Sequence, residues 1–303
     1  MVWHAFMLNP RFMRSLCHKE ILYRLPMPWE KIHEAIRNRD WTFTLKDADA
    51  RCFRDETGLH ADLLDEFSTW ADTVGTPLTP FVGFSVPRKP IVGHEKALVQ
   101  KYRDHFAWAD KDLAAKLKDA VVRQSEFVDK MNNHLWIRSP ALGGTLSRAI
   151  HRYGDFLHLL RLCPGRTIVP TLDIDLVWHT HQCSSPKQYA EAMEDMVGRF
   201  VNHDDTIAKD SLREGFDFSQ SLWHVHLGTE YRVCGCWDCE ALLSAVDDLQ
   251  AKEEAGVATN MEDVTNLSLE VQKVVTYYRA VEVSVRAQRR LPVMRDEASV
   301  ARF

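Results

Sequence analysis

Ten residues, DIDLVWHTHQ at 173–182, hold two aspartates, a tryptophan and two histidines. If this stretch is helical, Asp175 and His179 are four residues apart and share one face. The carboxylate can then accept a hydrogen bond from the imidazole and fix its tautomer, which makes His179 a candidate metal ligand or general base. His181 points from another face and is a candidate acid or base. A buried Asp175–His179 pair that only stabilises the fold explains the same spacing.

The HDD motif at 203–205 is a second candidate. Imidazole and carboxylate groups are ligands of divalent cations, and this motif follows the first one by a single predicted helix. A returning chain could therefore bring His203 and Asp204 to His179. We predict a divalent metal site of these three residues, with Asp175 orienting His179. An aspartate that caps the next helix explains the motif equally well.

The third candidate is a cysteine cluster, Cys234, Cys236 and Cys239, which follows an H-x-H pair at His224 and His226. Three thiolates with His226 as the imidazole would complete the tetrahedral ligand set that zinc prefers. Two alternatives stay open. The cysteines could be reduced and packed with a tryptophan before a helix, or one thiol could be reactive because it lies at that helix N-terminus.

Composition excludes several other kinds of chemistry. The net charge of −5 gives no basic surface for nucleic acid, so we expect a small molecule or a protein as partner. No phosphate loop or dinucleotide motif occurs, which argues against a nucleotide cofactor and leaves a divalent metal, zinc above all, as the expected one. The chain shows neither an apolar run long enough for a membrane nor a signal peptide at its start. With seven cysteines, an odd number, it is expected to be cytoplasmic, in a reducing compartment, without a membrane partner.

The elements that must position these residues are predicted to be helices. Apolar residues recur at three and four positions in short segments between 11 and 73, at 109–135, at 140–162 and near the end of the chain. In the 140–162 segment Ile150, Phe156, Leu157 and Leu160 are expected on one buried stripe. We predict a mostly α fold with few or no strands. Its expected parts are an N-terminal helical unit at 1–75, a Pro-rich connection at 76–95, a main unit at 96–240 and C-terminal helices at 241–303.

A short repeat relates the two ends of this fold. VWH at residues 2–4, followed by MLNPRF, matches VWH at 177–179, followed by QCSSPKQY. The match predicts two related helix-Pro-helix units in a bundle-like domain. It also places His4 where it could share a site with His179. If the repeat is real, we expect the chain to begin inside the first unit, without the residues that would precede Val2.

The motifs DIDLVWHTHQ, SPKQY and HDD, together with VWHAFMLNPRF, resemble the glycine-rich-domain-containing-protein-like family of plants and fungi. The CGCWDCE stretch resembles the fungal members. The resemblance covers residues 1–240 and implies a helical domain of unknown function, with little implied chemistry. The glycine-rich tail that names the family is absent, since the chain holds 13 glycines in all.

Two functions fit these observations. The first is a metal-dependent enzyme of hydrolase or lyase type, with a His/Asp site in the helical core, because a purely structural core seldom collects so many titratable groups. The second is a binding or scaffold module with a structural Cys/His zinc site. The first predicts that the histidines of the two motifs converge, and the second predicts that they are dispersed.

Overall fold

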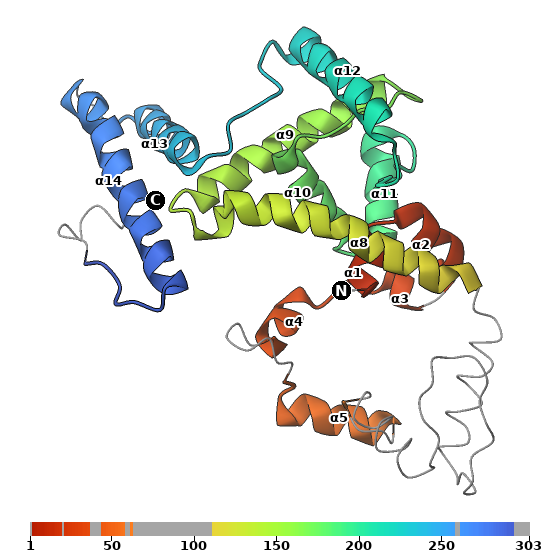
Figure 1. The fold of residues 1–303 in the computed structure, drawn as a ribbon. Helices are drawn as coiled ribbons and strands as arrows, with labels where there is room; N and C mark the ends of the chain where they lie inside the picture. Colours follow the sequence, from red (N-terminus) through yellow and green to blue (C-terminus); the bar gives the residue numbers. More distant parts are fainter. Residues whose placement is uncertain are drawn as a thin grey trace, which may run out of the picture. The chain divides into compact units, whose positions relative to one another are not determined.

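The computed structural model describes residues 2–19, 21–36, 44–57, 61–62, 111–257 and 261–293. Within these ranges the chain forms helices and no strand, which confirms the predicted mostly α fold (Figure 1). The helices are α1 (Val2–Met7), α2 (Pro10–Cys17), α3 (Ile21–Arg24), α4 (Trp29–Ala35), α5 (Asp47–Thr57), α8 (Lys111–His134), the 3₁₀ turn η1 (Trp136–Arg138), α9 (Leu142–Leu162), α10 (Leu172–Gln182), α11 (Pro186–Val197), α12 (Lys209–Leu227), α13 (Trp237–Glu254) and α14 (Met261–Arg286).

The chain divides into two compact units. One unit combines Met1–Pro26 with Lys116–Phe303, and the other spans Met27–Ala115. All candidate site residues belong to the first unit. The predicted Pro-rich connection at 76–95 lies outside the described residues, so the boundaries placed around it stay predictions.

The repeat seen in the sequence has a structural counterpart. Helix α1 is followed by α2, which begins at Pro10, and α10 is followed by α11, which begins at Pro186. Proline suits the first position of a helix because its backbone nitrogen needs no partner there. Helix α2 packs against α11, so the two helix-Pro-helix units lie together in the first unit.

The main core of this unit lies among α9, α10, α11 and α12. Phe156, Leu157 and Leu160 of α9 are buried as predicted, whereas Ile150 is 58% exposed. The buried stripe instead begins at Thr145 and continues through Ala149 and Tyr153, so Ile150 lies one position outside it. Side chains of this core from the other three helices are Ile174, Trp178, Tyr189, Met193, Val197 and Trp223.

A buried ion pair fixes the start of α10. The Arg152 guanidinium of α9 donates to Asp173 at 2.7 Å and to the Tyr231 carbonyl at 2.7 Å. The same guanidinium stacks over the Trp223 ring, 4.8 Å from its centroid. Charge-assisted hydrogen bonds of this kind hold a specific geometry. The first turn of α10 is therefore held in place relative to α9 and α12.

The segment before α12 differs from the prediction. The HDD motif is a possible helix cap by sequence, but α12 begins at Lys209, after Ala208. Helix α11 ends at Val197 and is followed by Gly198, whose φ of +78° favours glycine, and the chain then runs to the HDD motif without helix. The motif therefore lies in an extended segment and a turn between two helices.

A second, smaller core joins α13 and α14. Figure 1 shows these two helices side by side, and α13 also packs against α9. Its buried residues are Ala141, Trp237, Ala241, Ala245, Val271 and Val275. In the described part of the chain, no helix has both the length and the apolar character needed to cross a membrane.

Candidate metal centre in the helical core

Asp175, His179 and His203 converge in the core. The Nε2 atoms of His179 and His203 are 3.1 Å apart, and Asp175 Oδ1 lies 3.5 Å from the first and 3.4 Å from the second. Asp175 and His179 come from one face of α10, as their spacing of four predicts. His203 comes from the segment that follows α11. The three side chains therefore present one potential ligand atom each to a common point.

Packing around the motif explains this convergence. The Trp178 indole donates to Tyr189 Oη at 2.9 Å, and Tyr189 donates in turn to the Val201 carbonyl at 2.9 Å. This chain of hydrogen bonds ties α10 to α11 and fixes the segment two residues before His203. The Trp178 ring also meets the His203 ring edge to face, with centroids 5.0 Å apart. The His203 side chain is thereby directed toward α10.

Helix α8 covers the cluster. The Phe127 ring lies 4.2 Å from the His179 ring, centroid to centroid. One turn before it, Arg123 forms an ion pair with Asp205 at 3.0 Å, and Gln124 donates to the same carboxylate at 3.4 Å. His179 and His203 are only 5% and 9% exposed. Sequence reasoning missed the role of α8 and of Asp205, because no spacing rule links residues about 80 positions apart.

Burial and charge set the protonation states of the cluster. The pKa of His179 is lowered to about 4, mainly by burial; the Asp175 charge opposes this effect, and the neighbouring His203 and His4 add to it. Burial would raise the pKa of Asp175, but contact with His203 and the charges of His179 and Lys130 outweigh it, so its pKa lies below the ordinary value. At neutral pH His179 is therefore neutral and Asp175 ionised, the forms in which both groups bind a metal.

Several polar atoms of the cluster lack ordinary hydrogen-bond partners. Asp175 Oδ1 is buried, and its contacts of 3.4–3.5 Å exceed the usual N–H···O range of about 2.7–3.2 Å. The Nδ1 atoms of His179 and His203 are also buried and have no partner among the described residues. An unsatisfied buried polar group costs about 1–3 kcal/mol. Hydrogen bonding alone therefore does not explain why these three polar side chains are buried together.

Two predicted site residues are not brought to this cluster. Asp204 is exposed, and its Oδ1 accepts from the backbone N–H and the hydroxyl of Thr206 at 3.0 and 2.6 Å. His181 is half-buried, and its Nδ1 lies 2.9 Å from the Tyr153 hydroxyl. Asp175, predicted to orient His179, itself stands where the prediction placed Asp204. Which of the two carboxylates, Asp175 or Asp204, reaches the histidines depends on the conformation of the turn at the HDD motif. The sequence does not reveal that conformation.

His4 of the first helix-Pro-helix unit acts on the cluster through its charge. Its imidazole is one of the groups that lower the pKa of His179, and its own pKa is lowered by burial and by the charged chain start. Nearby, the Arg11 backbone N–H donates to Asn202 Oδ1 at 3.1 Å, next to His203. The two repeated units therefore meet beside the cluster.

The cysteine motif forms a separate group at the start of α13. The sulfur atoms of Cys234, Cys236 and Cys239 all lie within 4.8 Å of one another. His226, predicted to complete the set, is exposed on α12, and among the described residues the group of potential ligands holds only the three cysteines. The predicted ligand set is therefore assembled in three of its four members.

Comparison with known proteins agrees with the resemblance noted in the sequence. Residues 87–192, which include α8 to α10 and most of α11, match the family described as Glycine-rich domain-containing protein-like, and this confirms the predicted family for that segment. The chain is 34% identical over 127 residues to Glycine-rich domain-containing protein 1 of Arabidopsis thaliana, covering 39% of this chain and 15% of the relative.

Glycine-rich domain-containing protein 2 of the same plant is 37% identical over 98 residues, covering 30% of this chain and 12% of the relative. The chain thus matches less than a sixth of the length of either relative. No solved structure matches it. Asp175 and His179 lie inside the matched family segment, whereas His203 and the cysteine motif follow it.

Proposed function

We propose that this helical domain binds a divalent metal ion through Asp175, His179 and His203. The observation that carries the proposal is the separation of the three ligand atoms, 3.1–3.5 Å. A tetrahedral ion bound at about 2.0–2.1 Å holds its ligand atoms about 3.3–3.4 Å apart, and an octahedral ion holds neighbouring ones about 3.0 Å apart. The cluster fits either geometry with little rearrangement.

The number of ligands favours a catalytic role. Structural zinc sites are closed by four protein ligands, whereas catalytic sites use three and keep a position for water. A bound ion would lower the pKa of that water and supply a hydroxide for hydrolysis or a base for elimination. The protein would contribute a neutral imidazole, an ionised carboxylate and a dry surrounding. We therefore propose a metal-dependent hydrolase or lyase as the function.

Metal analysis of variants tests this proposal. Purified chain should contain or take up about one divalent ion that His179→Ala abolishes. His181→Ala is the matched control, because His181 lies on the same helix but contacts Tyr153 instead of the cluster. Hydrolysis of a panel of ester and phosphoester substrates should then require both the metal and His179. Equal metal content in the two variants would overturn the proposal.

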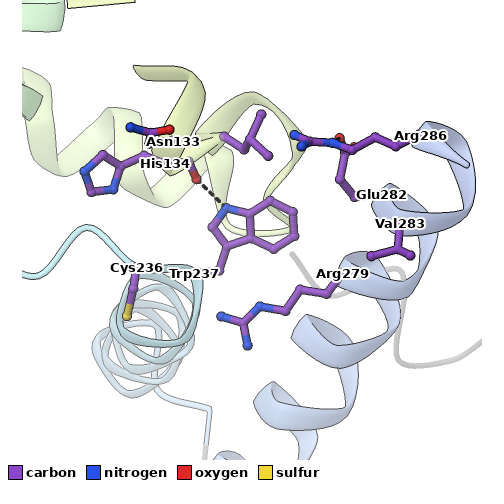
Figure 2. A pocket seen from close by; sticks show the side chains of 9 residues that line it. Asn133, His134, Cys236, Trp237, Arg279, Glu282, Val283 and Arg286 are labelled. Carbon is purple, nitrogen blue, oxygen red and sulfur yellow. Dashed lines mark hydrogen bonds and ion pairs between the residues drawn. The ribbon is translucent and has the colours of Figure 1, made fainter. Parts of the chain in front are cut away.

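A binding or scaffold module is the second candidate. It is favoured by a cavity of about 440 Å³ between the end of α8, the start of α13 and α14. Figure 2 shows Trp237 between these elements, with Arg279 and Glu282 reaching from α14. If variants of Asp175, His179 and His203 lose no activity and the chain binds a ligand at this cavity, the second candidate holds and the first does not.

A further inference from the structure

The cysteine group at the start of α13 is independent of the core cluster and of the function proposed for it. Its three sulfur atoms lie within 4.8 Å of one another. Zinc bound at about 2.3 Å to each sulfur would hold the sulfurs about 3.8 Å apart. Small side-chain movements therefore suffice for all three to reach one ion.

The turn between the first two cysteines is held by neighbouring elements. The Gly235 carbonyl accepts from the Trp136 indole at 2.7 Å, and His134 Nδ1 lies 3.2 Å from the same oxygen. The Trp136 ring approaches so closely that a Cβ at position 235 would lie 2.7 Å from it. Only glycine fits this position, and the turn is fixed against the end of α8 and against η1.

The helix that follows is anchored in the same way. The Trp237 indole donates to the His134 carbonyl at 2.8 Å, the contact drawn as a dashed line in Figure 2. Cys236 precedes α13 as its N-cap, and a helix N-terminus stabilises a thiolate. The positions of Cys236 and Cys239 are thus fixed by the first turn of α13, which is itself pinned to α8.

A core-packing role or a redox role for the three cysteines fits the structure less well. Reduced cysteines that only fill a core would be buried, but Cys234 is exposed, and Cys236 and Cys239 are half-buried. A dithiol that exchanges with disulfides needs two sulfurs, so the third sulfur at the same point would have no role. A metal uses all three.

Tetrahedral zinc needs a fourth ligand beside the three sulfurs. No histidine or carboxylate of the described residues joins the three sulfurs, and His226 is exposed on another helix. His134 is near, but its Nδ1 faces the Gly235 carbonyl. We infer that Cys234, Cys236 and Cys239 form a three-thiolate zinc site whose fourth position is open and takes water or another exchangeable small ligand.

Cobalt substitution in the full chain tests this site. Protein stripped of metal and reloaded with Co²⁺ should show a thiolate-to-cobalt charge-transfer band. Cys236→Ser should abolish the band and remove about one bound zinc per chain. Cys52→Ser, at an exposed cysteine of α5, is the matched control and should keep both. Because the core cluster holds no sulfur, His179→Ala should leave this band unchanged, so the two sites can fail separately.

A second measurement tests whether the fourth position is open. Imidazole added to the cobalt protein should shift the visible spectrum, since an exchangeable ligand can be replaced. No thiolate band in the unmodified chain would overturn the site, as would a Cys236–Cys239 disulfide in protein purified under mild reduction. If added imidazole leaves the visible spectrum unchanged, or if His226→Ala changes it, the fourth position is not open.

Discussion

Asp173 and Asp175 lie on two different faces of α10, and their carboxylates differ in hydrogen bonding. Asp173 accepts from Arg152 Nε at 2.7 Å, and Arg152 Nη2 donates to the Thr171 hydroxyl and to the Tyr231 carbonyl. Asp175, two residues later, has an oxygen without an ordinary hydrogen bond, beside two imidazoles that each have a buried unpartnered nitrogen. One face satisfies its polar groups, as structural networks do. The other face brings Asp175 Oδ1 and the two Nε2 atoms together without an ordinary hydrogen bond to the carboxylate, as a metal site would before the ion binds.

The largest effect is expected from disrupting the hydrogen-bonded network around Asp173. Arg152→Met leaves the Asp173 carboxylate buried without its partner, and we expect a loss of about 3–5 kcal/mol in the free energy of unfolding. Denaturant titration measures it. Arg213→Met, at an exposed position of α12, is the matched control and should change stability by less than about 0.5 kcal/mol. If Arg152→Met also changes the free energy of unfolding by less than about 0.5 kcal/mol, the ion pair does not fix the start of α10.

The second test uses pH on metal-free protein. The pKa of His179 is lowered from 6.5 to about 4, so between these values the unfolded chain binds a proton that the folded chain does not. Stability should therefore fall as pH drops through this window, by about 3 kcal/mol for the full shift. The lowered pKa of Asp175 acts in the same direction at lower pH.

The matched variant for this pH test is His179→Gln, which cannot titrate. Its stability should depend less on pH between 6.5 and 4 than that of the unmodified chain. Unfolding curves at a series of pH values provide the comparison. The same pH slope in both proteins would show that His179 titrates as it does in water.

The third test separates binding from folding on the open face. Asp175→Asn keeps the size of the side chain but removes the charge of a direct ligand, so we expect metal affinity to fall by at least about 10- to 100-fold, or roughly 1.4–2.7 kcal/mol. The metal-free protein should remain folded. If Asp175→Asn instead unfolds the chain without any metal present, the Asp175–His179 pair belongs to the fold.

The smallest expected effect concerns His181. His181→Phe removes its contact of 2.9 Å with the Tyr153 hydroxyl, a loss of about 0.5–1.5 kcal/mol. Metal affinity should not change, because His181 lies apart from the cluster. A fall in affinity similar to that of Asp175→Asn would place His181 in the site after all.

The sequence predicted those parts of the fold and site that depend on local spacing. The helices, the proline starts at Pro10 and Pro186, and the pairing of Asp175 with His179 follow from residues a few positions apart. The closeness of Cys234, Cys236 and Cys239 is local for the same reason.

The parts that depend on tertiary packing could not be predicted in this way. His203 reaches His179 because Trp178 and Tyr189 fix the segment before it, and Phe127 covers the cluster from a distant helix. Nothing in the HDD motif tells which of its side chains faces inward. The exclusion of Asp204 and of His226 from the ligand groups reflects the same limit.

The most direct test of the core metal site is X-ray absorption at the metal edge, measured on the Cys236→Ser chain so that thiolate-bound metal does not contribute. We expect an ion with two imidazole nitrogens and carboxylate or water oxygens, and we expect this ion to be lost in His203→Ala. A Cys236→Ser chain that retains no metal, or an ion without imidazole ligands, would contradict it.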